Sequence, residues 1–246
     1  MRADEYLEAL RTCPVTTSRE LTEGRPFVVL SPHPDDETLG TGGLIAEACA
    51  RNQEVDVIVV TDGSGSHPRS KRYPSKRLVE LRCSEVHKAG LALGLPPDRI
   101  VCLGLPDTMA PKSGLLFDAA VEETLSVIRR AGAGALFVTW ERDPHCDHEA
   151  VAELAKTVRR KNPALRLWAY PIWGWHIEAS AEIRQPPLKA SRIDISPYRD
   201  RKLQAIAAHA SQMTNLISDD PDGFRFDERS LAPFLGRYEY FIEVPV

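Results

Sequence analysis

The chain has 246 residues, of which 43% are hydrophobic and 27% charged, which is typical of a globular protein with one sizeable core. Its net charge of −4 is the difference between 31 basic and 35 acidic residues. The sequence has no long block of residues with the same charge, which argues against a nucleic-acid-binding surface. No stretch approaches the ~20 apolar residues that span a bilayer, and the polar start Arg2-Ala3-Asp4-Glu5 does not resemble a signal peptide. We therefore expect a cytoplasmic protein with no membrane partner.

Short apolar runs alternate with helical patterns along most of the chain. After an amphipathic helix over 3–11, the expected strands are rich in Val, Ile, Leu and aromatic residues and cover 26–30, 55–61, 99–103, 135–140 and 165–172. Helical spacing between these strands covers 39–51, 75–93, 116–130 and 147–160. This alternation predicts a Rossmann-like α/β fold with three layers, in which helices cover both faces of a mostly parallel sheet.

Residues 174–196 break the alternation with Pro186-Pro187 and an expected strand over 191–195. A helix over 197–213 and a strand over 238–244 follow. We expect one domain over 1–246, with a core of about 26–172 and a small C-terminal strand and helix addition of about 173–246 that determines substrate specificity.

The five cysteines are odd in number, widely spaced and without a Cys-x-x-Cys pair: Cys13, Cys49, Cys83, Cys102 and Cys146. This pattern argues against a disulfide framework and against a thiolate zinc site, and reduced thiols suit the cytoplasm. Cys146 lies between two histidines, so it is either a nucleophile or, as is commoner for a free cysteine, a small buried filler.

The segment Ser31-Pro32-His33-Pro34-Asp35-Asp36-Glu37 directly follows the first core strand, at the kind of strand end where open α/β sheets bind ligands. His33 and Asp36 are three residues apart, so in a tight turn both side chains can face one centre, whereas Asp35 must point elsewhere. One carboxylate can then bind a metal while the other transfers a proton. The two prolines stiffen the turn, as a preorganised metal site requires.

A second polar loop, residues 141–149, follows the strand over 135–140 and contains His145 and His148. Both loops should lie at the carboxyl edge of one parallel sheet, so His33, Asp36 and one of these two histidines can meet. Two histidines and a carboxylate with open positions suit catalytic zinc. Taken singly, His-x-x-Asp is more often a hydrogen-bonded loop pair and Asp-Asp a helix cap, but two such loops after strands favour a metal site.

These motifs resemble the LmbE-like or PIG-L family of zinc-dependent deacetylases, which remove acetyl groups from N-acetylglucosamine-type amino sugars. The second motif of the family reads His-Pro-Asp-His, and here Cys146 replaces its proline. Weaker similarity covers Thr61-Asp62-Gly63, Arg82 with Glu85, Leu105-Pro106-Asp107 and His209-Ala210-Ser211-Gln212.

The resemblance implies that His33, Asp36 and His148 hold Zn²⁺, with Fe²⁺ as an acceptable replacement. It further implies that Asp35 is the general base that takes a proton from metal-bound water. His145 would protonate the leaving amine or stabilise the oxyanion, with Asp147 orienting it.

The resemblance also assigns Arg82 and Asp107 to the hydroxyls of the sugar, although a surface charge and a strand-end cap are nearly equal alternatives. The remaining aromatic and histidine candidates have mostly structural interpretations. For Trp173, Trp175 and His176, packing in the core is favoured over stacking on a sugar. His67 is expected in a solvated loop rather than in a lid, and His87 is expected at the surface. His209 is expected to be a structural histidine with its hydrogen bonds satisfied.

The sequence therefore predicts a metal-dependent hydrolase that deacetylates an N-acetylated amino sugar or glycoside. Alternatives are an amidase acting on a thiol-sugar conjugate or on the N-acyl group of a natural product. A non-haem iron enzyme, a phosphoesterase and a metal-storing module are less favoured, because iron triads usually lie on β-sandwich barrels and no second carboxylate cluster is apparent. The expected partner is a small-molecule substrate, and homo-oligomerisation stays open.

Overall fold

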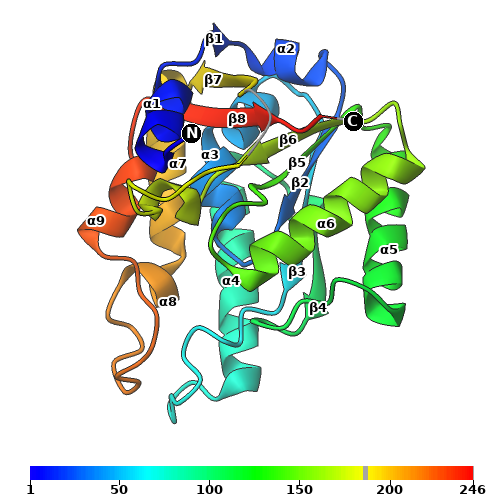
Figure 1. The fold of residues 1–246 in the computed structure, drawn as a ribbon. Helices are drawn as coiled ribbons and strands as arrows, with labels where there is room; N and C mark the ends of the chain where they lie inside the picture. The colour runs from blue at the N-terminus through cyan, green and yellow to red at the C-terminus, as the bar shows by residue number, and fades with distance from the viewer. Residues whose placement is uncertain (185–187, 246) are drawn as a thin grey trace.

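The computed structural model describes residues 1–184 and 188–245, which contain one eight-stranded sheet with helices on both faces (Figure 1). The strand order is β1-β7-β8-β6-β5-β2-β3-β4. Only β8 runs antiparallel to its neighbours β6 and β7 within this part of the chain. The strands are β1 (Val15–Thr16), β2 (Phe27–Ser31), β3 (Val55–Thr61), β4 (Ile100–Leu105), β5 (Ala135–Thr139), β6 (Arg166–Tyr170), β7 (Ala190–Asp194) and β8 (Tyr238–Glu243).

The helices of the chain alternate with the strands between β2 and β6, as predicted. They are α1 (Ala3–Arg11), α2 (Ser18–Thr22), α3 (Asp36–Ala50), α4 (Ser75–Leu93), α5 (Leu115–Ala131), α6 (Cys146–Lys161), α7 (Arg199–Ala208), α8 (Ala210–Met213) and α9 (Glu228–Leu231). Short 3-10 turns cover Pro97–Arg99, Trp173–His176, Ser196–Tyr198 and Ala232–Phe234. The predicted Rossmann-like α/β fold is confirmed.

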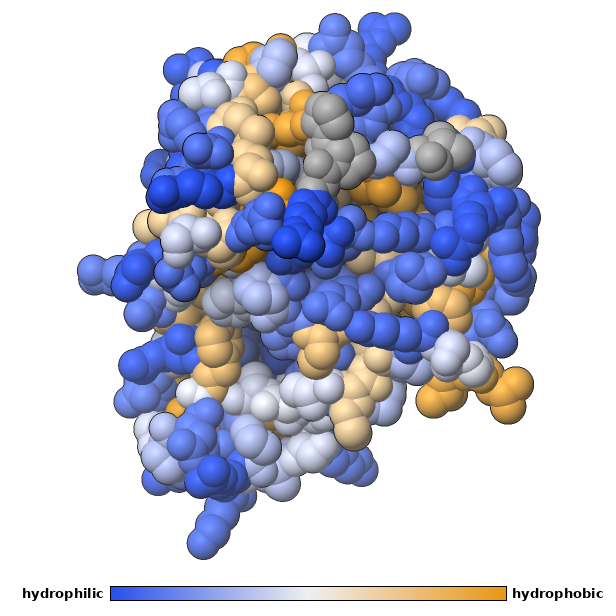
Figure 2. Space-filling model, viewed as in Figure 1, coloured by the Kyte–Doolittle hydropathy of each residue, from blue (hydrophilic) through white to orange (hydrophobic). Residues whose placement is uncertain are grey.

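The sheet is buried on both faces because its strands alternate between two apolar clusters. In β2, Phe27 and Val29 pack on the side of α3, α4 and α7, whereas Val28 and Leu30 pack on the side of α5 and α6. A third cluster joins α1 to Trp140 and β8. The outer face in Figure 2 is mostly hydrophilic, with hydrophobic residues in separate patches. No helix in the described residues is both long and apolar enough to cross a membrane.

Two predictions of local structure need correction, and two short elements were not predicted. The expected helix over 197–213 is a 3-10 turn followed by α7 and α8, because His209, with a φ of −80° and a ψ of 55°, interrupts it. Helix α3 begins at Asp36 rather than at 39, and β1 and α2 were not predicted. The Pro186-Pro187 break lies outside the described residues. The division into a core and a C-terminal addition stays a prediction, although β7 and β8 lie in the same sheet as the core strands.

Candidate metal centre and active site

Two loops at the carboxyl edge of the sheet bring the candidate ligands together. Strands β2 and β5 are parallel neighbours, with Leu30 opposite Val138, so the turn before α3 and the loop before α6 end side by side. The turn carries His33 and Asp36 and the second loop leads to His148, and all three residues are buried. The juxtaposition expected from the sequence is therefore present.

Three ligand atoms form a nearly regular triangle. The Oδ2 atom of Asp36 lies 3.1 Å from Nδ1 of His33 and 3.2 Å from Nε2 of His148, and the two ring nitrogens are 3.3 Å apart. Atoms bound tetrahedrally to one metal at about 2.0–2.1 Å lie roughly 3.3 Å from one another. The geometry of these donors therefore fits a four-coordinate metal ion with one position left open.

Buried carboxylates orient both imidazoles toward this triangle. The outer nitrogen of His33, Nε2, lies 3.0 Å from Oδ2 of Asp147, and the outer nitrogen of His148, Nδ1, lies 2.9 Å from Oδ2 of Asp143. If each outer nitrogen carries the hydrogen, the lone pair of the other nitrogen faces the metal position. Asp143 was not among the predicted site residues, and its only signal in the sequence is its place two residues before His145.

Asp147 contacts His145 through its backbone rather than its side chain, and its role in orienting His145 stays a prediction. Its carboxylate accepts the backbone N–H groups of Thr108 at 2.7 Å and Ala110 at 2.9 Å, as well as facing His33. His145 instead receives the backbone N–H of Asp147 at its Nδ1 atom, at 3.2 Å. The side chain of Asp147, in the first turn of α6, is directed toward the 108–110 loop. The contact between Asp147 and His145 is therefore made by the backbone of Asp147.

Asp35 forms a buried ion pair beside the triangle. The guanidinium of Arg82, only 3% exposed, donates to Oδ2 of Asp35 and to the carbonyl of Pro34, both at 3.1 Å, and to the carbonyl of Gly63 at 3.0 Å. The surface interpretation of Arg82 is therefore wrong. Burial raises the pKa of Asp35 to about 7, Arg82 opposing this rise and Asp36 adding to it.

Asp107 also reaches the centre, rather than merely capping a strand. Its Oδ1 atom lies 3.3 Å from Nε2 of His33, and its Oδ2 atom accepts the N–H of Gly65 at 2.8 Å. Burial would raise the pKa of Asp107, but the contact with His33 lowers it well below the usual range. Asp107 thus adds a negative charge to the centre.

The carboxylates make the centre favourable for positive charge. Burial alone would lower the pKa values of His33 and His148, but Asp107, Asp147 and Asp36 hold that of His33 well above its usual value. Asp36 and Asp143 similarly hold the pKa of His148 at about 9. The chemistry of the donor set thus fits a bound cation.

His145 differs in its electrostatics from the other two imidazoles. Burial and the charges of His33 and His148 lower the pKa of His145 to about 4. Its ring lies 4.6 Å from that of His33 and borders the adjacent pocket.

A pocket of about 290 Å³ opens beside the triangle and has two unlike walls. One wall is polar and includes Asp35, Arg82 and Asp107, and the other consists of Trp173, Phe224 and Phe226. Trp173 stacks on Phe226 with ring centroids 5.5 Å apart, so it both packs and lines the site. The phenylalanines were not predicted, because no local pattern connects residues 224 and 226 to the metal motifs.

The other candidates lie away from this pocket or differ from expectation. Trp175 packs on Tyr240, and His176 is exposed beside the carbonyl of Ser230. His67 is buried rather than solvated, because the Ser66 carbonyl next to it accepts the N–H of Phe224 and fastens this loop.

Cys146 is exposed at the start of α6, not a buried filler. The partial burial of its thiol and the neighbouring Asp147 carboxylate raise the pKa of Cys146, which disfavours the thiolate that a nucleophile requires.

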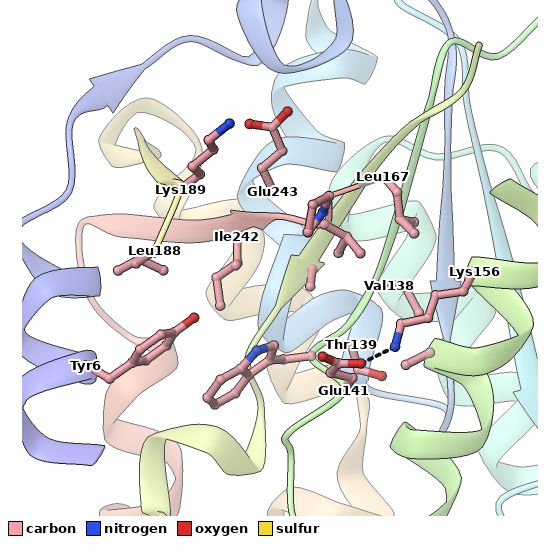
Figure 3. Close-up of a pocket in the computed structure, with 15 residues that line it drawn as sticks. Tyr6, Val138, Thr139, Glu141, Lys156, Leu167, Leu188, Lys189, Ile242 and Glu243 are labelled. Atoms are coloured by element: carbon pink, nitrogen blue, oxygen red, sulfur yellow. Dashed lines mark hydrogen bonds and ion pairs between the residues drawn. The ribbon is translucent and has the colours of Figure 1, made fainter. Parts of the chain in front are cut away.

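A larger cavity of about 610 Å³ lies elsewhere, over β5, β6 and β8 between α1 and α6 (Figure 3). Its walls include Tyr6, Leu188 and Ile242, with the ion pair of Lys156 and Glu141 at one side. None of the candidate metal ligands lines it. The smaller pocket is therefore the candidate active site.

Comparison with known proteins points to the same chemistry. The family described as PIG-L, GlcNAc-PI de-N-acetylase, matches residues 28–158. The 1D-myo-inositol 2-acetamido-2-deoxy-alpha-D-glucopyranoside deacetylase of Mycolicibacterium smegmatis is 24% identical over 264 residues, covering 89% of this chain and 90% of the relative.

Two solved structures share the fold. The N,N'-diacetylchitobiose deacetylase of Pyrococcus horikoshii has a TM-score of 0.65 and 19% identity, over 98% of this chain and 92% of its own. The zinc-inhibited form of teicoplanin deacetylase Orf2 has a TM-score of 0.65 and 20% identity, over 89% of this chain and 97% of its own. The family match covers more than half of the sequence and contains both metal motifs. The chain belongs to the PIG-L family.

Proposed function

We propose that this protein is a zinc-dependent hydrolase that removes the acetyl group from an N-acetylated amino sugar or glycoside. The observation that carries the proposal is the triangle of His33, Asp36 and His148 beside a pocket that also contains Asp35. Membership of the PIG-L family and the names of the deacetylases similar to this chain support it. An N₂O donor set with an open position suits zinc, and ferrous iron accepts the same donors.

A bound zinc ion would supply a water of lowered pKa and polarise the carbonyl of the amide. Asp35 lies between the candidate ligands His33 and Asp36 in the sequence and borders the pocket, so we assign it the proton of the attacking water. Arg82 holds one of its carboxylate oxygens, which fixes the direction of the other. His145, on the same pocket, has a lowered pKa that keeps its ring neutral, which favours a hydrogen bond to the oxyanion over protonation of the leaving amine.

The pocket supports a single sugar ring as the recognised unit. A volume of about 290 Å³ is at the small end of ligand sites, so the rest of a glycoside would extend outside it. The Asp107 carboxylate can accept from sugar hydroxyls, and Arg82, already bonded to three oxygens, would act mainly by holding the polar wall. The Trp173 wall would pack on the apolar face of the ring. Thiol-sugar conjugates and natural-product N-acyl groups present the same amide and remain alternatives.

The test is an acetate-release screen of N-acetyl sugars and glycosides with zinc-reconstituted protein. We expect Asp35→Asn to bind one zinc per chain but to lose about 10²- to 10⁴-fold in turnover, the usual worth of a general base. A chelator should abolish activity, and added zinc should restore it. Absence of acetate release across the panel, or an Asp35→Asn variant as fast as the wild type, would contradict the proposal.

A further inference from the structure

The carboxylate of Glu37 is buried under the turn that carries the candidate ligands. It is 3% exposed, and its Oε2 atom accepts the backbone N–H of Asp35 at 3.0 Å and lies 3.1 Å from Oγ of Ser31. Asp35 has a φ of 156° and a ψ of −28°, a conformation that residues other than glycine rarely adopt. Glu37 therefore helps to hold the candidate general base in a strained position.

The other oxygen of Glu37 faces His209, which comes from the break between α7 and α8. Nε2 of His209 lies 3.4 Å from Oε1 of Glu37 and 3.1 Å from Oγ1 of Thr38. Thr38 donates its hydroxyl hydrogen to Oε1 of Glu37 at 2.8 Å, so toward His209 it can only accept. Nε2 of His209 therefore carries a hydrogen and donates it to this pair.

The environment of His209 indicates that the N–H group at Nε2 is the property of the imidazole that matters at this position. The residue is 0% exposed, and its Nδ1 atom has no hydrogen-bond partner among the described residues. A buried unpaired nitrogen is destabilising, so stability alone would favour an apolar side chain here. An apolar side chain cannot reproduce the hydrogen bond from Nε2.

His209 also connects this turn to the segment that lines the pocket. Its carbonyl accepts the N–H of Gln212 at 2.9 Å, and the carbonyl of Gln212 accepts the N–H of Phe226 at 2.9 Å. Gln212 and Phe226 both border the pocket. The break at His209 thus places the imidazole of His209 against the turn that carries the candidate ligands and places the residues that follow it beside the pocket.

We propose that His209 is a positioning residue, which through Nε2 orients the Glu37 carboxylate and thereby holds Asp35 and the metal-facing Asp36. The kinetic part of this inference rests on the proposed deacetylase function. The part that concerns metal binding is independent of the substrate.

The experiment compares His209→Leu, which removes the donor, with His209→Gln, whose amide N–H can replace it. At saturating zinc we expect His209→Leu to lose about tenfold or more in kcat with KM changed less than about twofold, and His209→Gln to recover most of the loss. Chelator competition should show about 10-fold weaker zinc binding for His209→Leu. The matched control is His87→Leu on α4, whose ring contacts the carbonyl of Cys83 in its own helix, and it should match the wild type in both measurements.

A double variant tests the route through Glu37. Glu37→Gln combined with His209→Leu should lose no more than the worse single variant, because both changes break the same contact. Additive losses would overturn the route. Equal losses in His209→Leu and His209→Gln would reduce the role to packing, and a folded His209→Leu variant with unchanged zinc affinity and kcat would refute it.

These experiments distinguish a failure of the proposed deacetylase function from a failure of the proposed role of His209. If the wild type releases no acetate, the proposed function fails and zinc competition alone decides the role of His209. If His209→Leu does not fold, the zinc affinity of His209→Gln decides instead, with about tenfold weakening overturning the donor role.

Discussion

Replacing Asp143 with asparagine should weaken zinc binding about 10- to 100-fold, the usual effect of losing a residue that orients a metal ligand. This corresponds to about 1.4–2.8 kcal/mol of binding free energy. Both oxygens of Asp143 accept N–H groups: Oδ2 from His148 and from Ile172, each at 2.9 Å, and Oδ1 from Gly174 at 2.7 Å. An asparagine has one oxygen, so its amide NH₂ must face one of these donors.

Each orientation of the asparagine has a cost. If its NH₂ faces His148, it also faces the N–H of Ile172, which stays unpaired. The Nδ1 atom of His148 then becomes an acceptor, and the ring hydrogen moves to Nε2, which faces the metal position. If its NH₂ faces Gly174, a buried N–H stays unpaired, which costs about 1–3 kcal/mol of folding stability. The first orientation blocks the ligand, and the second strains the loop that carries it.

The assay is competition for zinc against a chromogenic chelator, with ¹⁵N NMR of the imidazoles to identify the tautomer of His148. Asp56→Asn is the matched control, because Asp56 is 0% exposed and pairs with Arg99 and Arg130 at the other edge of the sheet. It should leave zinc affinity unchanged. An Asp143→Asn variant that folds and binds zinc within about twofold of the wild type would refute the reasoning.

Two further changes test the packing and the charge of the site. Gly40→Ala should destabilise the fold by about 1–3 kcal/mol, because a Cβ there would lie 2.2 Å from Cδ2 of Tyr170, whereas Gly236→Ala meets nothing within 4 Å and serves as the control in thermal unfolding. Zinc binding should release protons, and the zinc affinity should rise from about pH 6 to about pH 9, because zinc must displace protons from His33 and His148. Burial lowers the pKa of His148, but the neighbouring carboxylates raise it by more, to about 9. Calorimetry in buffers of different ionisation enthalpy measures this release, and a pH-independent affinity would contradict it.

Local patterns were sufficient for long elements with strong periodicity. The predicted bounds of β3 and α4 match the structure, because each has a continuous pattern that does not depend on distant residues. Strand β1 was missed because it has two residues and is formed by pairing Val15 with Arg192 of β7. Helices α7 and α8 were merged because no local pattern marks the break at His209, whose side chain contacts Glu37 and Thr38, far away in the sequence.

Local features of the sequence indicate the metal chemistry: donor type, three-residue spacing and position after a strand point to His33, Asp36 and one of the two histidines of the second loop, and the family resemblance selects His148. How those donors are supported depends on the packing of distant segments: Asp143 contacts His148, and Arg82 is buried against Asp35. The physical reason is that burial and pairing depend on which distant segments pack together. Candidate donors can therefore be recognised in each loop separately, whereas their orientation and charge depend on all the segments that meet at this edge of the sheet.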